Sequence, residues 1–135
     1  MPTCRLSLTL SLFGLLGLAP LPALAQSAAD APISLRCGGI GSDESSAMLA
    51  ESKAHALTLL YVSRDGHYMS DVQTRIASLD GEHAAEQSCG PIGQVHVAAP
   101  GRYKLTARFG SQQQDKTLTL KPRGGQRLVL RWQAE

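Results

Sequence analysis

The chain has 135 residues, of which 43% are hydrophobic, and its 13 lysines and arginines nearly balance its 11 aspartates and glutamates. A chain of this length suits one domain and leaves little room for a second. The overall charge by itself indicates no class of partner. After residue 25, no segment is apolar enough to cross a membrane.

The N-terminus has the features of a secretory signal peptide. Arg5 precedes an apolar run from Leu6 to Ala19, and the small-residue pattern of residues 23–25 follows two prolines. We expect cleavage after Ala25 and a flexible leader over residues 26–32, which gives a periplasmic or secreted protein without a stable membrane anchor. A single uncleaved anchor is the alternative, although glycines and prolines interrupt the short apolar run.

The cysteine count agrees with export. Once Cys4 leaves with the signal peptide, Cys37 and Cys89 remain. In an oxidising compartment an even pair most simply forms a disulfide, and closing a loop of about 50 residues would stabilise the domain by roughly 4 kcal/mol. The competing interpretation is a redox or metal pair, but no Cys-x-x-Cys spacing supports it.

The first strand, predicted over residues 33–37, ends at an unusual glycine-rich segment. Ser42 or Asp43 in this segment can cap a short helix over residues 45–51. Three glycines before a helix also fit a phosphate-binding loop, but no Gly-Lys-Ser or Gly-Lys-Thr motif follows, and two acidic residues lie where a phosphate would bind. We interpret the segment as a turn, a helix cap and a candidate partner-binding loop, formed by Gly38, Gly39, Ile40, Gly41, Ser42, Asp43 and Glu44.

The middle of the chain predicts a hairpin and an edge. Residues 56–63 are apolar on both sides, which is typical of a central strand. Arg64–Gly66 predicts a hairpin turn to a partner strand within residues 67–77, and residues 79–82 predict a second turn. Residues 83–93 predict a loop or an edge strand.

The C-terminal part predicts further strands. After a short strand that contains Val95 and Val97, Pro100 and Gly101 form a turn into a strand that alternates strictly through Phe109. The remaining elements are a polar hairpin loop over residues 110–115, a strand over residues 117–120, a turn over residues 122–125 and a last strand over residues 127–132. Residues 33–135 thus predict an all-β fold, a single Ig-like antiparallel β-sandwich with about seven strands and at most one short helix after the first strand.

Charge is distributed unevenly along the chain. Residues 26–100 carry four basic and nine acidic side chains, whereas residues 101–135 carry eight basic and two acidic ones. A basic face could bind an acidic partner, an anionic glycan or a lipid headgroup. The alternative is that basic side chains on solvated strands discourage edge-to-edge aggregation. The candidate face consists of Lys104, Arg108, Lys116, Arg127 and Arg131.

No residue cluster predicts catalysis, a cofactor or a metal. The spacing of the four histidines places no two on adjacent helical turns or on alternate strand positions. The chain has no Gly-x-Ser-x-Gly elbow, and its carboxylate pairs lie in polar turns. We expect no nucleic-acid partner, because Tyr103, Phe109 and Trp132 fall on inner faces and the basic strands lack stacking aromatics.

The C-terminal motifs resemble a known family. Ala99-Pro-Gly-Arg-Tyr-Lys-Leu-Thr-Ala, followed by Lys116-Thr-Leu-Thr-Leu120 and Gln126-Arg-Leu-Val-Leu-Arg-Trp132, resembles the closing half of carboxypeptidase-regulatory-like domains, which are transthyretin-like sandwiches. With the glycine-rich segment upstream, the chain also resembles small exported proteobacterial proteins that carry this domain. The resemblance implies a fold but no activity. The related hydroxyisourate hydrolases end in Tyr-Arg-Gly-Ser, a tail that this chain lacks.

Three functional hypotheses follow. The first is a non-enzymatic module that binds a protein or a cell-envelope component through its loops or its basic hairpins. The second is an inhibitor or immunity-type protein against an envelope-active enzyme, with the Gly38–Glu44 loop as a plug. The third is a small hydrolase or a metal-binding protein.

Overall fold

The structure is a computed structural model that describes Gly17 and residues 32–133. Apart from Gly17, the predicted signal peptide and residues 26–31 of the predicted leader lie outside the described residues. In the described part of the chain, no helix has the length and hydropathy needed to cross a membrane.

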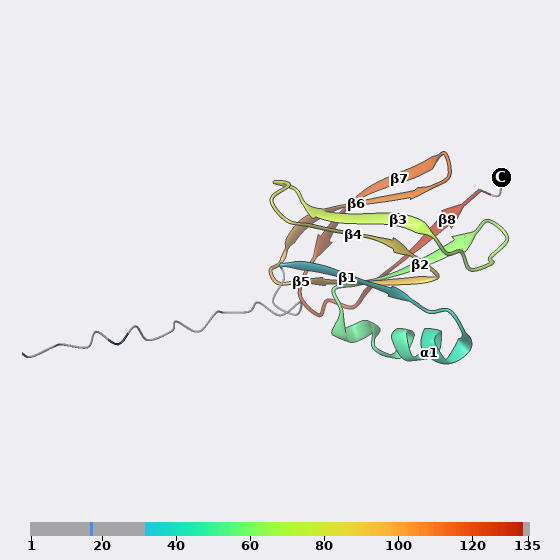
Figure 1. Cartoon of the computed structure of the whole chain (residues 1–135), viewed down its shortest axis with the longest axis horizontal. Coiled ribbons are helices and arrows are strands. Elements are labelled where there is room, and N and C mark those ends of the chain that lie inside the picture. Colours follow the sequence, from blue (N-terminus) through green and yellow to red (C-terminus); the bar gives the residue numbers. More distant parts are fainter. Residues whose placement is uncertain (1–16, 18–31, 134–135) are drawn as a thin grey trace, which may run out of the picture.

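The described chain forms a β-sandwich of two four-stranded sheets with one short α-helix against its outer side (Figure 1). The first sheet has the strand order β1-β5-β2-β8 and the second has the order β4-β3-β6-β7. This confirms the predicted all-β sandwich with a short helix after the first strand. In chain order the elements are β1 (Ile33–Gly38), α1 (Ser42–Ala50), a 3-10 turn η2 (Ser52–Ala54), β2 (Leu57–Ser63), β3 (Val72–Ser78), β4 (Ala84–Cys89), β5 (Ile92–Val97), β6 (Gly101–Phe109), β7 (Gln112–Leu120) and β8 (Gln126–Trp132).

The core lies between the two sheets. In β6, the buried side chains of Tyr103, Leu105 and Ala107 alternate with exposed ones, as the period-2 pattern predicts. Trp132 on β8 is buried, and its ring centroid lies 6.2 Å from that of Phe109. Burial of each large apolar side chain contributes about 1.5–3 kcal/mol. The most regular stretch of the sequence therefore builds the scaffold.

One buried hydrogen bond joins the sheets near the centre of the core. The hydroxyl groups of Tyr61 on β2 and Thr74 on β3 lie 2.8 Å apart. Burial is the main cause that raises the pKa of Tyr61 above its ordinary value, and the bond to Thr74 opposes this rise. The phenol therefore stays neutral and can serve as a hydrogen-bond partner.

The chain path after β2 differs from the predicted hairpin. Residues 64–66 do form a turn, in which the Ser63 N–H donates to the His67 carbonyl, and a single bridge joins Val62 to Tyr68. However, β3 lies in the second sheet, between β4 and β6. Because β5 and β8 already occupy both sides of β2, the returning strand has no free edge in the first sheet.

One strand pair departs from the antiparallel expectation. β8 runs parallel to β2, with Leu59 opposite Leu128 and Tyr61 opposite Leu130. All the other strand pairs that the structure describes are antiparallel. The direction of β8 arises because the chain crosses from β7 in the second sheet to the first sheet, instead of folding back on β7 as a hairpin.

Two polar segments differ in how they compare with the prediction: residues 83–93 contain the edge strand that was one of the two alternatives, and residues 110–115 are more regular than expected. Residues 84–89 form β4, an edge strand of the second sheet, so the described chain has eight strands where about seven were predicted. β7 begins at Gln112, which pairs with Phe109, so the predicted loop over residues 110–115 shortens to a two-residue turn. β7 lies at the edge of its sheet and carries mostly polar side chains. Its sequence therefore lacks the apolar alternation that would predict a strand.

Candidate partner-binding site

The Gly38–Glu44 loop leads from β1 into α1 at one end of the sandwich (Figure 1). Gly39 and Gly41 have φ angles of 91° and 94°, which residues with side chains rarely adopt. A Cβ atom at Gly39 would also lie 2.9 Å from carbon atoms of the Ile92 side chain on β5. The glycines therefore fix the path of the loop and hold Ile40 between them.

The helix begins differently from the prediction. The N-cap is Gly41, and no side chain caps the helix. The Ser45 N–H donates to the Gly41 carbonyl and the Ser45 hydroxyl donates to the Ser42 carbonyl, both at 3.1 Å. The expected cap by Ser42 or Asp43 is therefore wrong, because the positive φ of Gly41 turns the chain into the helix one residue earlier.

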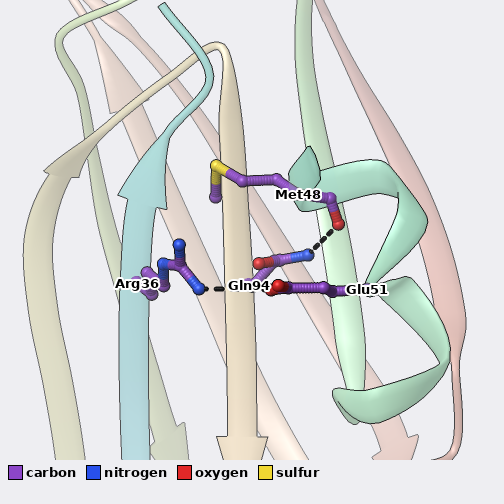
Figure 2. Close-up of polar contacts among 4 residues, drawn as sticks. All are labelled: Arg36, Met48, Glu51 and Gln94. Carbon is purple, nitrogen blue, oxygen red and sulfur yellow. Dashed lines mark hydrogen bonds and ion pairs between the residues drawn. The ribbon is translucent and has the colours of Figure 1, made fainter. Parts of the chain in front are cut away.

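The helix packs on the outer face of the first sheet, beside β5 and in front of β2 (Figure 2). Met48 is buried there, and the Gln94 side-chain amide donates to its carbonyl at 2.6 Å. Arg36 and Glu51 form an exposed ion pair at 3.3 Å beside this bond. Burial and the Gln94 bond hold the helix, whereas an exposed ion pair contributes little.

Ile40 borders a cavity that the sequence does not predict. Its side chain is 73% exposed, and Tyr68, which lines the same cavity, is 59% exposed. The cavity has a volume of about 510 Å³. The loop, the start of α1, the segment between β2 and β3, and the β4–β5 turn contribute its walls, which consist of Gly39, Ile40, Gly41, Ser42, Ser45, Tyr68, Met69, Ser70 and Pro91.

A second cavity adjoins the first and shares Ile40 and Ser70 with it. Asp71 and both cysteines of the disulfide line it. At Gly90, φ is 125°, and a Cβ atom would collide with the Met69 backbone, so the β4–β5 turn passes directly against the segment after Tyr68. We call this continuous surface the Ile40 groove, defined by residues 37–42, 45, 68–71 and 87–91.

The predicted disulfide is confirmed and lies beside the groove. Cys37 on β1 and Cys89 on β4 are bonded, with their Cα atoms 5.0 Å apart. β1 and β4 are edge strands of different sheets, so the bond joins the two layers of the sandwich. The same covalent bond therefore holds both the start of the loop and one wall of the groove.

The predicted basic residues do not share one face. Lys104 and Arg108 alternate with the buried residues of β6, so they lie on the outer side of the second sheet. Arg127 and Arg131 alternate with the buried residues of β8, so they lie on the outer side of the first sheet. Lys116 pairs with the inward residue Leu105 and lies on the inner side of β7. The structure thus distributes the five residues over three surfaces.

The histidines come from separate elements. Among residues 32–133 and Gly17, no group of three or more His, Cys, Asp or Glu side chains has the geometry to hold a metal ion. Burial is the main cause that lowers the pKa of His55. Glu51 opposes this effect, and the charges of Arg36 and His96 add to it.

A serine, an aspartate and a histidine meet in the turn between β3 and β4. The Ser78 hydroxyl donates to the Asp80 carboxylate and accepts from the backbone N–H of His83. The Ser78 bond is the main cause that lowers the pKa of Asp80, and the Glu82 N–H adds to it. These bonds involve the backbone of His83, so they close the turn and do not form a nucleophile–base pair of the kind that hydrolases use.

Sequence reasoning found one side of the groove and missed the other. The Gly38–Glu44 loop was recognised from its glycines, but Tyr68 and Met69 were assigned to a partner strand, and Ser70 was given no role. The one local signal for a surface role was an aromatic residue close to a turn, and that signal is weak. Their position depends on the crossing of the chain from one sheet to the other.

In comparisons with known proteins, neither a protein-family model nor a curated protein matches this chain. The resemblance to carboxypeptidase-regulatory-like domains therefore stays a prediction.

Proposed function

We propose that this protein is an exported, non-enzymatic module that binds a protein partner through the Ile40 groove. The observation that carries the proposal is the position of exposed apolar side chains. Four large apolar side chains are exposed in the described part of the chain, and two of them, Ile40 and Tyr68, line one cavity. Contiguous exposed apolar surface of this kind is typical of interaction sites.

The rigidity of the groove supports the proposal. The disulfide lies in its wall, Gly39 packs against Ile92, and Gly90 packs against the Met69 backbone. A surface that is already ordered loses little conformational entropy when a partner binds. The groove therefore holds two exposed apolar side chains ready for contact.

Export is part of the proposal and is supported by two features. The N-terminal sequence has the pattern of a signal peptide, and the Cys37–Cys89 bond is compatible with an oxidising compartment. Mass spectrometry of the protein recovered from the periplasm should give a mature N-terminus at Gln26. A chain that retains residues 1–25 would contradict export with cleavage.

To test binding, a partner is first captured from the periplasm by affinity purification. Its affinity is then compared between single groove variants and a matched control variant. Ile40→Ser and Tyr68→Ser should each weaken the captured complex by about tenfold or more, because buried apolar anchors dominate interface energetics. The matched control is Leu79→Ser, which removes another exposed apolar side chain, 53% exposed, at the turn after β3. Equal losses for the groove variants and the control would contradict the proposal.

The second candidate function, inhibition of an envelope-active enzyme, has a specific observation in its favour. Ile40 protrudes between two glycines of positive φ on a loop that begins beside the disulfide. A protruding side chain on a fixed loop can enter an active-site cleft. If the captured partner is an enzyme, saturating amounts of this protein should abolish its activity. An enzyme that stays fully active would exclude inhibition and leave the binding module.

A further inference from the structure

The border of the Ile40 groove carries negative charge. Asp43 and Glu44 lie in the first turn of α1, next to Ser42, which lines the groove. The Glu44 carboxylate reaches back over the loop, since a Cβ atom at Gly38 would lie 2.6 Å from its Oε1. Asp71 lines the second cavity of the groove. Two carboxylates, those of Glu44 and Asp71, therefore lie at the border of the groove. Asp43 adds a third negative charge in the adjoining first turn of α1.

Positive side chains lie elsewhere. Within the described residues, no lysine or arginine lines either cavity of the groove. Arg64, in the turn after β2, lines a separate hollow together with Arg131 and Trp132. The groove is thus a region of negative potential around an apolar centre, and it favours a partner of opposite charge.

The helix N-terminus adds a weaker, opposite contribution. The first amide groups of α1 carry a partial positive charge of about half a unit, which attracts anions. The carboxylates of Asp43 and Glu44 place two full negative charges in the same turn. Their sum outweighs the partial charge of the amides, so an anionic occupant is disfavoured.

We infer that the occupant of the groove is a cationic segment of the protein partner. One apolar side chain of this segment packs against Ile40 and Tyr68, and the lysines or arginines that flank it face the three carboxylates. The inference rests on the proposed function, because it names the chemistry of the partner at the same surface. The apolar anchor supplies affinity, and the flanking charges supply selectivity and rapid association.

Two synthetic probes test the charge preference. They are acetyl-Ser-Lys-Leu-Lys-Ser-amide and acetyl-Ser-Glu-Leu-Glu-Ser-amide, which share the leucine and differ in the sign of their charge. Each is titrated into the isotopically labelled exported protein while backbone amide NMR shifts are recorded. The lysine probe should shift amides of residues 39–45 and 68–71 and bind about fivefold more tightly than the glutamate probe.

Charge-removing variants sharpen the test. Asp43→Asn combined with Glu44→Gln should reduce the preference between the probes to less than about twofold. The control Glu82→Gln removes an exposed carboxylate from the β3–β4 turn, at the other end of the sandwich, and should leave the preference unchanged (Figure 1). Added salt should weaken the lysine probe more than the glutamate probe, because exposed charges are screened.

Three outcomes would overturn the inference. They are equal binding of the probes, tighter binding of the glutamate probe, and the absence of shifts in the groove with both probes. Its failure is distinguishable from that of the proposed function. If Ile40→Ser weakens the natural complex and the combined Asp43→Asn and Glu44→Gln variant leaves its affinity unchanged, binding in the groove is supported. A cationic partner segment is then excluded. If Ile40→Ser leaves the complex unchanged, the proposed function itself fails.

Discussion

The two open sides of the sandwich are closed in different ways. On one side, β1 and β4 are joined by the Cys37–Cys89 bond. On the other side, the edge strands β7 and β8 are joined by glutamine side chains. The Gln112 side chain donates to the Gln133 carbonyl at 2.9 Å and accepts from the Gln133 N–H at 3.1 Å, as a backbone group would. Gln114 donates to the Arg131 carbonyl at 2.7 Å.

The difference shows where the fold can support a binding surface. Water competes with the exposed hydrogen bonds of the glutamine side chains, so each bond contributes modestly to stability. Water does not compete with the covalent disulfide. The Ile40 groove lies beside the covalent link. The disulfide can therefore hold the exposed apolar side chains of the groove in place, although no extensive core lies beneath them.

The largest expected effect comes from breaking the covalent side. Replacing both cysteines, Cys37→Ala and Cys89→Ala, should lower the free energy of unfolding by about 4 kcal/mol, because the bond closes a loop of 52 residues. Urea denaturation monitored by tryptophan fluorescence measures the change, since Trp132 is buried in the core. A loss below about 1 kcal/mol would mean that the two sides of the sandwich are equivalent.

Breaking the glutamine side should have a smaller effect. Gln112→Ala and Gln114→Ala should each lower the free energy of unfolding by about 0.5–1.5 kcal/mol, the net contribution of ordinary hydrogen bonds. The control is Gln113→Ala, because its amide donates to Asp115 on the same strand and does not reach β8. If the control destabilises the protein as much as Gln112→Ala does, the bonds to β8 are not what holds this side.

The smallest effect is expected in the outer layer, where α1 covers the first sheet. A double-mutant cycle with Arg36→Ala and Glu51→Ala should give a coupling energy below about 1 kcal/mol, because both side chains are more than half exposed. The coupling should vanish in 1 M salt. A coupling that is larger and independent of salt would show that this ion pair, and not burial of Met48, holds the helix.

Local pattern predicted most of the fold. The alternation from Tyr103 to Phe109 and the apolar run of β2 identified strands, because burial on one or both faces leaves a period that the sequence displays. The even number of cysteines after the predicted signal peptide predicted the disulfide. The pairing of β3 and the direction of β8 could not be predicted, since they depend on which strands occupy the two sides of β2.

The candidate site was predicted only in part for a related reason. Glycines mark the Gly38–Glu44 loop, because a positive φ angle is a local requirement. The exposure of Tyr68 depends on where the chain leaves one sheet for the other, which no local period records. The same limit applies to the basic residues. Lys116 and Lys104 occupy neighbouring strands of one hairpin, yet their register places them on opposite sides of the sheet.

The most direct test of the Ile40 groove is site-specific photo-crosslinking in cells that express the protein. A photoreactive phenylalanine analogue replaces Tyr68 in one variant and Leu79, at the other end of the sandwich, in a control. We expect the analogue at position 68 to crosslink to a defined protein. Added wild-type protein should reduce this crosslink, whereas the added Ile40→Ser variant should not. Identical crosslinks from both positions, or none from Tyr68, would contradict a binding site in the groove.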